Sequence, residues 1–236
     1  MQGRAVIAKR LIERFGDVCA QVPGFYLAGR NGRRWWSLSG SPGLVVPVRS
    51  LDGHVIALKV RADASIKGPK YTMIISAKYG DPSPGAQVHV PLFGGVCGDT
   101  VRLNEGELKS DIALVLSSVM TISVPGVALW RKALPVLQAL RPRQVLLAFD
   151  SDWQFNSHVA HAFGQAAFTV LRAGYEVQVE TWDPTLGKGI DDLLVAGYAP
   201  AVQSVALAFG AGLRGQARIW TGHLRTVAAA EVPPWH

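Results

Sequence analysis

The chain of 236 residues is 49% apolar, which allows one large domain or two small ones with a substantial core. It holds no apolar stretch long enough for a membrane span and no signal-peptide pattern at its start, so we expect a cytoplasmic protein with no membrane partner. Its two cysteines, Cys19 and Cys97, cannot form a four-ligand zinc site by themselves, so we expect no zinc.

The formal charge of +7 is unevenly distributed along the chain. Residues 1–100 hold 13 Lys and Arg against 6 Asp and Glu, whereas residues 101–236 hold 11 of each kind. A basic N-terminal part suits a polyanionic partner, and a surface kept basic for solubility is the alternative.

The first residues predict a helix followed by turns. Apolar residues near helical spacing predict the helix over residues 4–22, and the glycines and prolines of residues 23–42 predict turns. The second stretch contains Arg33-Arg34-Trp35-Trp36, in which the tryptophans either stack on single-stranded bases or anchor the core.

Strand patterns then follow, which predict a small basic module of mostly β-structure. The four candidate strands are residues 44–48, 54–60, 71–76 and 87–90. The turn Leu51-Asp52-Gly53 joins the first two into a hairpin. Residues 93–98 are rich in glycine and predict a linker, so the basic module spans residues 1–98.

From residue 99 the pattern changes to alternating strands and helices. The predicted strands are residues 101–104, 119–124, 144–149 and 176–182, and the predicted helices are residues 107–118, 129–140, 156–173 and 190–197. This alternation predicts an α/β domain over residues 99–198, with a mostly parallel sheet and helices on both faces. Residues 199–236 predict a C-terminal helical extension, with its helix over residues 199–222, and a loose tail.

Three carboxylates follow two of these strands. Glu105 ends the first strand, and Asp150 and Asp152 follow the buried apolar run of residues 144–149. Two parallel strands that end side by side would bring the carboxylates together at the edge where open α/β sheets bind ligands. Clustered carboxylates repel one another unless a cation joins them, and hard oxygen ligands suit Mg²⁺, with Mn²⁺ as an alternative. Helix capping or loop hydrogen bonding is the structural alternative for the two aspartates.

The order of these motifs resembles the Toprim domain of bacterial-type primases, topoisomerases and some nucleases. The resemblance rests on Asn104-Glu105-Gly106, on Phe149-Asp150-Ser151-Asp152, and on Gly187-Lys188-Gly189-Ile190-Asp191-Asp192-Leu193-Leu194. Residues 46–55 and 68–71 are similar to the basic subdomain that precedes Toprim in replicative primases. The nearest likeness is to the primase-like Toprim proteins of phages, plasmids and other mobile elements.

This resemblance implies roles for individual residues. Glu105, Asp150 and Asp152 would be catalytic and would hold one or two metal ions, with Asp191 as a further acidic ligand. Nucleic acid or nucleotide would be bound by basic residues, namely Arg49, Lys59, Arg61, Lys70 and Lys109. The alternatives are a solvated helix face for Lys109, an exposed edge that discourages aggregation for the other basic residues, and helix capping for Asp192.

The implied function is DNA primase-like nucleotidyl transfer, with synthesis of short primers on single-stranded DNA from nucleotide triphosphates. The sequence departs from replicative primases because it has no zinc module, and because Gly189 stands where those proteins have the first aspartate of Asp-Pro-Asp. It also has no Walker A motif, which a fused helicase would need. A separate helicase or zinc-binding subunit is therefore a candidate partner. A Toprim nuclease and a noncatalytic nucleic-acid-binding subunit of a replication complex remain alternatives.

Overall fold

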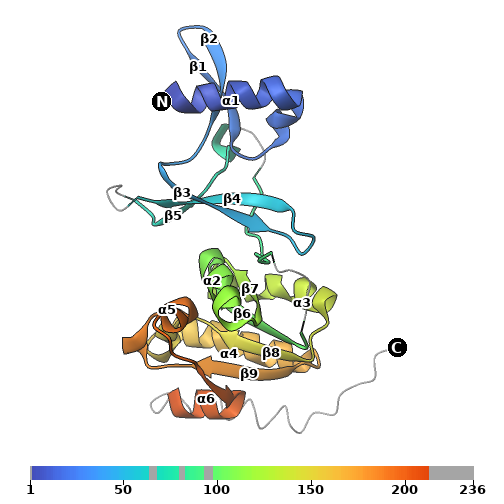
Figure 1. The fold of residues 1–236 in the computed structure, drawn as a ribbon, viewed down its shortest axis with the longest axis vertical. Coiled ribbons are helices and arrows are strands. Elements are labelled where there is room, and N and C mark those ends of the chain that lie inside the picture. The colour runs from blue at the N-terminus through green and yellow to red at the C-terminus, as the bar shows by residue number, and fades with distance from the viewer. Residues whose placement is uncertain (1, 64–67, 80–82, 93–97, 213–236) are drawn as a thin grey trace. The chain divides into compact units, whose positions relative to one another are not determined.

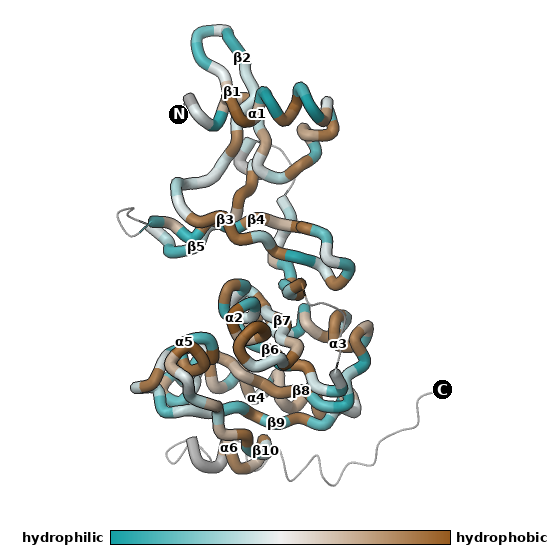
Figure 2. The backbone as a smooth tube through the Cα atoms, viewed as in Figure 1, coloured by the Kyte–Doolittle hydropathy of each residue, from teal (hydrophilic) through white to brown (hydrophobic). Residues whose placement is uncertain are grey.

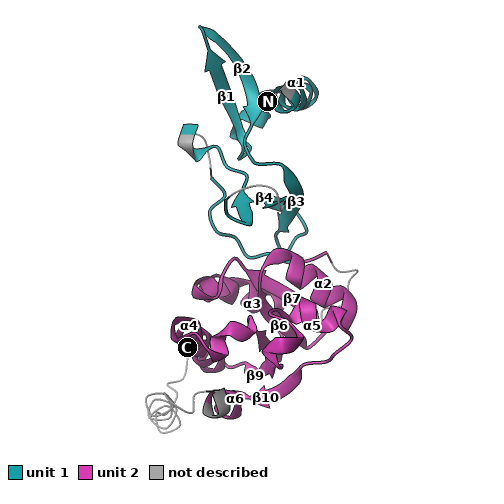
Figure 3. Ribbon diagram, turned by 90° about the vertical axis from the view of Figure 1, so that its left-hand side faces the viewer, with its two compact units in different colours: residues 1–90 teal, residues 91–236 magenta. Residues whose placement is uncertain are grey.

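The computed structural model describes residues 2–63, 68–79, 83–92 and 98–212. The chain divides into two compact units, residues 1–90 and residues 91–236 (Figure 3). Cys97 and the rest of the predicted linker, apart from Gly98, lie outside the described residues. None of the helices in the described ranges has both the length and the apolar character of a membrane span.

The N-terminal unit begins with helix α1 (Gln2–Phe15), which continues into a short 3-10 helix (Gly16–Gln21). Figure 2 shows α1 alternating between hydrophobic and hydrophilic turns, as expected for a helix with one packed face. This face covers a small core formed by Ala8, Cys19 and Phe25. Cys19 is a free, buried thiol, as expected for a reduced cysteine.

The prediction of turns over residues 23–42 is wrong, because most of this stretch forms a β-hairpin of β1 (Phe25–Arg30) and β2 (Arg33–Leu38). Asn31 and Gly32 both have positive φ, 52° and 75°, which matches the twist of a two-residue hairpin turn. Asn31 and Gly32, which indicate a turn in the sequence, therefore form the turn that connects the two strands.

A three-stranded antiparallel sheet completes the N-terminal unit. Its order is β3-β4-β5, and the strands are β3 (Gly43–Arg49), β4 (Val55–Ala62) and β5 (Tyr71–Met73). The predicted hairpin is thus confirmed. The prediction of a strand over residues 87–90 is wrong, since only His89 forms a β-bridge. The segment bonds to the end of β3, where Val90 N–H donates to Arg49 O at 2.9 Å.

The C-terminal unit is built on a five-stranded sheet of order β10-β9-β8-β6-β7 (Figure 1). Its strands are β6 (Thr100–Glu105), β7 (Met120–Val124), β8 (Gln144–Ala148), β9 (Glu176–Thr181) and β10 (Ala201–Ser204). All neighbouring pairs are parallel except β9 and β10. The expected mostly parallel sheet is confirmed by these pairings. Its central strands β6 and β8 are buried, although one face of β6 carries the polar residues Arg102 and Asn104.

Helices cover both faces of this sheet. They are α2 (Glu107–Ser117), α3 (Leu134–Leu140), α4 (Ser157–Arg172), α5 (Ile190–Val195) and α6 (Val205–Gly212), with a 3-10 helix (Val127–Ala133) before α3. Ala148 packs with α2 and α5, whereas the next residue, Phe149, contacts Phe163 of α4. Adjacent strand residues point to opposite faces, so α2 and α5 lie on one face and α4 on the other.

The prediction of a helix over residues 199–222 is wrong at its start. Residues 201–204 form β10, which adds an antiparallel edge strand to β9, and α6 begins only at Val205. Phe209 of α6 contacts Trp153 and Phe163, which places α6 on the α4 face of the sheet. The remainder of the predicted helix lies outside the described residues.

Candidate active site

The three predicted carboxylates follow two adjacent parallel strands. Glu105 is the last residue of β6, and Asp150 and Asp152 follow β8. The register pairs Asn104 of β6 with Ala148 of β8, so both strands end at the same level. The structure therefore places all three residues at the carboxyl edge of the sheet, as the strand order predicts.

Gly106 makes the turn between Glu105 and α2. Its φ of 92° and ψ of 134° lie where residues with a Cβ atom are rarely found, and its N–H donates to Val124 O at 3.0 Å. The glycine thus ties the end of β6 to β7 and allows α2 to begin at Glu107. This explains the Glu-Gly pair in structural terms.

Two lysine ammonium groups pair with the aspartates. Lys109, in the first turn of α2, donates a short hydrogen bond to Asp150 Oδ1. Lys188, in the loop before α5, lies 3.2 Å from Asp150 Oδ2 and 3.2 Å from Asp152 Oδ2. The expectation of a solvated helix face for Lys109 is wrong, because its side chain is only 27% exposed and pairs with Asp150.

Sequence reasoning missed Lys188 as a member of this site. The residue is far from Asp150 in sequence, and a lysine between two glycines has no intrinsic structural preference. Its proximity to the aspartates depends on the backbone bond from Ser151 N–H to Lys188 O (2.8 Å), which joins the loop after β8 to the loop before α5. The signal in the sequence is the Gly-Lys-Gly triplet immediately before the late acidic motif.

Burial and the neighbouring charges shift the pKa of two residues of the site, Glu105 and Lys188. Burial raises the pKa of Glu105, the negative charge of Asp150 raises it further, and the charges of Lys109 and Lys188 oppose the shift. Val127 N–H donates to Glu105 Oε2 at 3.3 Å and fixes the carboxyl group. Burial alone would lower the pKa of Lys188, but its bonds to Asp152 and Asp150 outweigh burial and raise it.

The two residues of the late acidic motif have different surroundings. Asp192 accepts hydrogen bonds from the N–H groups of Lys188 and Gly189, both at 3.1 Å, so it caps α5 as the structural alternative expects. Asp191 Oδ1 is buried and has no hydrogen-bond partner among the described residues. Burial, followed by the charge of Asp192, raises the pKa of Asp191, while Lys109 lowers it.

The donor set at this edge fits a divalent cation. Asp150 and Asp152 already share one cation, the Lys188 ammonium, and carboxylate oxygens are the ligands that Mg²⁺ prefers. In the part of the chain that the structure describes, no three acidic, histidine or cysteine side chains are arranged to hold a metal ion. Asp150 and Asp152, which share one cation, are therefore the residues that would hold the ion.

Three of the predicted basic residues gather in the N-terminal unit. Lys59 and Arg61 lie on one face of β4, opposite Met73 and Tyr71 of β5. Lys70 precedes Tyr71, and it lines a hollow of about 410 Å³ together with Arg61. We call Lys59, Arg61 and Lys70 the basic strand cluster. Arg49 lies at the other end of the β3–β4 hairpin, opposite Val55, so the structure does not bring it into this cluster.

The adjacent tryptophans of β2 point to different surroundings. Trp36 packs against the core of Ala8, Cys19 and Phe25, so it is a core anchor. Trp35 is 41% exposed and borders an apolar hollow of about 470 Å³ beside α1. Core packing is therefore the role of Trp36. Base stacking stays a prediction for Trp35 alone.

Comparison with known proteins adds information on the family and the fold. A family model described as a domain of unknown function (DUF3854) matches residues 99–200. No curated protein matches the chain. Among solved structures, the zinc-binding and RNA polymerase domains of the Aquifex aeolicus primase are 14% identical, with a TM-score of 0.62 over 91% of this chain and 53% of that chain.

Two further solved structures have the same architecture. A DNA primase domain from Pseudomonas aeruginosa is 18% identical, with a TM-score of 0.56 over 87% of this chain and 62% of that chain. A DnaG primase catalytic domain bound to ssDNA is 16% identical, with a TM-score of 0.50 over 87% of this chain and 64% of that chain. The chain therefore spans between half and two thirds of the length of these relatives.

The likeness establishes the fold, since it extends over most of the chain. The protein has the α/β fold of a bacterial DnaG-type primase catalytic core, in which a Toprim sheet follows a small basic α+β module. The fold class expected from the sequence is confirmed.

Proposed function

We propose that the chain is a DNA primase-like nucleotidyltransferase, which uses Mg²⁺ or Mn²⁺ to synthesise short primers on single-stranded DNA from nucleotide triphosphates. The observation that carries this proposal is the position of Glu105, Asp150 and Asp152 at the carboxyl edge of β6 and β8, within the fold of a primase catalytic core. Phosphoryl transfer needs positioning and charge stabilisation more than covalent chemistry, and a carboxylate cluster that can hold a cation provides both.

Each residue of the site has a defined part in the proposed reaction. Asp150 and Asp152 would hold the metal ion, which lowers the pKa of an attacking hydroxyl and stabilises the charge that develops on the phosphates. The carboxyl group of Glu105, with a raised pKa and a fixed orientation, is suited to accept the proton of the 3′-hydroxyl. Asp191, which has an unpartnered oxygen, would be a further ligand.

The basic strand cluster is the proposed contact for the template or for nucleotide phosphates. Arg61 and Lys70 line one hollow, and Lys59 lies on the same face of the strand as Arg61. One relative of the same fold is a primase catalytic domain bound to ssDNA, which supports a single-stranded template for this chain. Arg49 would contact the nucleic acid separately, at the turn end of the hairpin.

The proposed setting is the replication of a mobile element, such as a phage or plasmid, in the cytoplasm. The support is the motif resemblance of the late acidic segment to primase-like proteins of such elements. The same resemblance to replication proteins supports the proposal that a helicase or zinc-binding subunit works with the chain.

A noncatalytic nucleic-acid-binding subunit is the second candidate. It is favoured by one observation, that lysine ammonium groups neutralise Asp150 and Asp152 in the structure. Such pairing would stabilise the fold without any metal ion.

The proposal is tested by incubating the purified chain with single-stranded DNA, labelled nucleotide triphosphates and Mg²⁺ or Mn²⁺. The proposed function predicts labelled oligomers that require both template and metal ion. Shortening of the template without nucleotide incorporation would instead indicate a Toprim nuclease. DNA binding with neither activity would indicate the noncatalytic subunit.

A further inference from the structure

The ammonium group of Lys109 lies between Asp150 and the backbone of Gly189. Its side chain runs across two glycines: a Cβ atom at Gly106 would lie 3.7 Å from Lys109 Cδ, and one at Gly189 would lie 3.1 Å from Lys109 Nζ. It bonds to Asp150, and its charge also acts on Glu105 and Asp191. The ammonium group therefore supplies positive charge to this group of carboxylates.

Gly189 is needed for this arrangement. Any side chain there would collide with Asp191 Oδ1 and press on the Lys109 ammonium. The sequence thus has no acidic side chain at the position where one would supply a ligand to a second metal ion, and the lysine is packed beside that position. The two features are complementary, since the ammonium group makes a second divalent ion unnecessary for charge balance.

Lys188 differs from Lys109 in how its side chain is held. Its backbone is fixed at both ends, because its carbonyl accepts from Ser151 N–H and its N–H donates to Asp192 Oδ2. Its side chain is 63% exposed and reaches the aspartates from solvent. The ammonium group can therefore leave the aspartates without any change of the backbone.

We propose that this site binds one divalent ion, which replaces the Lys188 ammonium between Asp150 and Asp152, and that the Lys109 ammonium permanently takes the place of a second ion. The inference rests on the proposed function only in requiring a divalent ion at these aspartates. Lys188 is then an exchangeable counter-ion that keeps the metal-free site neutral, and Lys109 is a positioning residue for Asp150.

The test is the binding of Mn²⁺, measured by electron paramagnetic resonance and by titration calorimetry without nucleotide or DNA. The wild-type chain is expected to bind one ion. Lys188→Met removes the competing charge and is expected to bind one ion about tenfold more tightly, since a unit charge a few ångströms away changes binding by at least this factor. Lys109→Met is expected to bind a second ion.

The matched control is Arg172→Gln, which lowers the net charge equally at the far end of α4 and should leave Mn²⁺ binding unchanged. Two ions on the wild-type chain, or the same affinity for Lys188→Met as for wild type, would overturn the inference. Absence of Mn²⁺ binding by all variants would do so as well. Circular dichroism shows whether Lys109→Met folds. If it does not, the number of ions bound by wild type and the Mn²⁺ affinity of Lys188→Met still test the inference. The assay contains no nucleotide and does not depend on primer synthesis. A chain that makes no primers can therefore still confirm the inference about the metal site.

Discussion

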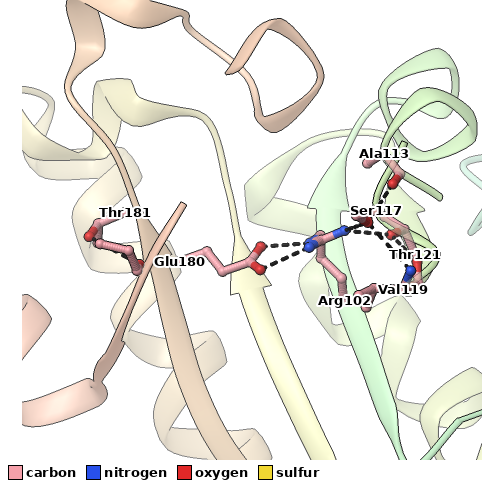
Figure 4. Close-up of polar contacts among 8 residues, drawn as sticks. Arg102, Ala113, Ser117, Val119, Thr121, Glu180 and Thr181 are labelled. Atoms are coloured by element: carbon pink, nitrogen blue, oxygen red, sulfur yellow. Dashed lines mark hydrogen bonds and ion pairs between the residues drawn. The ribbon is translucent and has the colours of Figure 1, made fainter. Parts of the chain in front are cut away.

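Arg102 and Glu180 form a buried, bidentate ion pair that spans a strand to which neither residue belongs. Arg102 lies in β6 and Glu180 in β9, with β8 between them, and the two bonds measure 2.6 and 2.9 Å (Figure 4). Arg102 also donates to Ser117 of α2 and Thr121 of β7. The pair therefore links three strands and a helix of the Toprim sheet on the face that α2 covers.

Arg102→Met is expected to destabilise the C-terminal unit by about 3–5 kcal/mol, because it leaves a buried carboxylate without its partner. The side chains of Arg102 and Glu180 are only 3% and 2% exposed, so water cannot compensate for the loss. Urea unfolding followed by circular dichroism measures the change. The double variant Arg102→Met/Glu180→Leu should recover most of the loss, and a single variant as stable as wild type would show that the pair is dispensable.

Asn104→Val is expected to stabilise the fold by about 1–3 kcal/mol. Asn104 is 1% exposed, and neither its amide oxygen nor its amide nitrogen has a hydrogen-bond partner among the described residues. Valine removes this cost and favours the strand conformation. The same unfolding experiment includes Asn156→Ala, which removes the side-chain cap of α4 and should destabilise by about 1 kcal/mol. A lower stability for Asn104→Val would mean that the amide has a stabilising partner.

Glu105→Gln is expected to stabilise the chain at about pH 8 relative to wild type, with a smaller difference at about pH 4. Burial, and then Asp150, raise the pKa of Glu105 in the folded state above its ordinary value of 4.5. The contribution of this carboxyl group to stability is therefore full below its ordinary pKa and is lost as the pH rises through the raised value. Glutamine carries no charge and avoids that loss.

Thermal unfolding of both proteins in the presence of a chelator checks this pH dependence. Glu176→Gln is the matched control, because it also removes one carboxylate, which here is exposed in a long pair with Arg143 (4.0 Å). A difference for Glu105→Gln that does not change between the two pH values would contradict the assigned direction of the pKa shift.

Arg61→Gln/Lys70→Gln is expected to weaken binding of single-stranded DNA and to make it less sensitive to salt. Each lost phosphate contact lowers the slope of log affinity against log salt by about 0.7 for a single strand. Fluorescence anisotropy at several salt concentrations measures both quantities. Arg4→Gln/Arg10→Gln removes the same charge from α1 and should change binding less. Equal effects of the two double variants would show that total charge, and not the basic strand cluster, determines binding.

The sequence was sufficient to place Glu105, Asp150 and Asp152. The strand before Asp150 ends in an apolar run, which is typical of the buried centre of a parallel sheet, and residues that follow such a strand lie at the ligand-binding edge. Glu105 was placed by the strand order and the Glu-Gly pair, since β6 itself carries Arg102 and Asn104. The pairing of Asp150 and Asp152 with Lys188 was not predictable, because it depends on how the loop of Lys188 packs beside Ser151.

The missed strands β1, β2 and β10 share a physical cause. The strands β1 and β2 carry exposed, charged residues, and β10 is a four-residue edge strand inside an apolar run that also suits a helix. Edge and exposed strands have no periodic apolar signal strong enough to identify them, and their partners decide their conformation.

The most direct test of the proposed function compares primer synthesis by the wild-type chain with that by Asp150→Asn/Asp152→Asn. Asparagine keeps the size of both side chains and removes the charges that would hold a metal ion, and Glu176→Gln serves as the control with an unrelated carboxylate removed. The account predicts labelled oligomers from wild type and from the control and none from the double variant. Equal synthesis by the double variant, or no synthesis by wild type with Mg²⁺ or Mn²⁺, would contradict it.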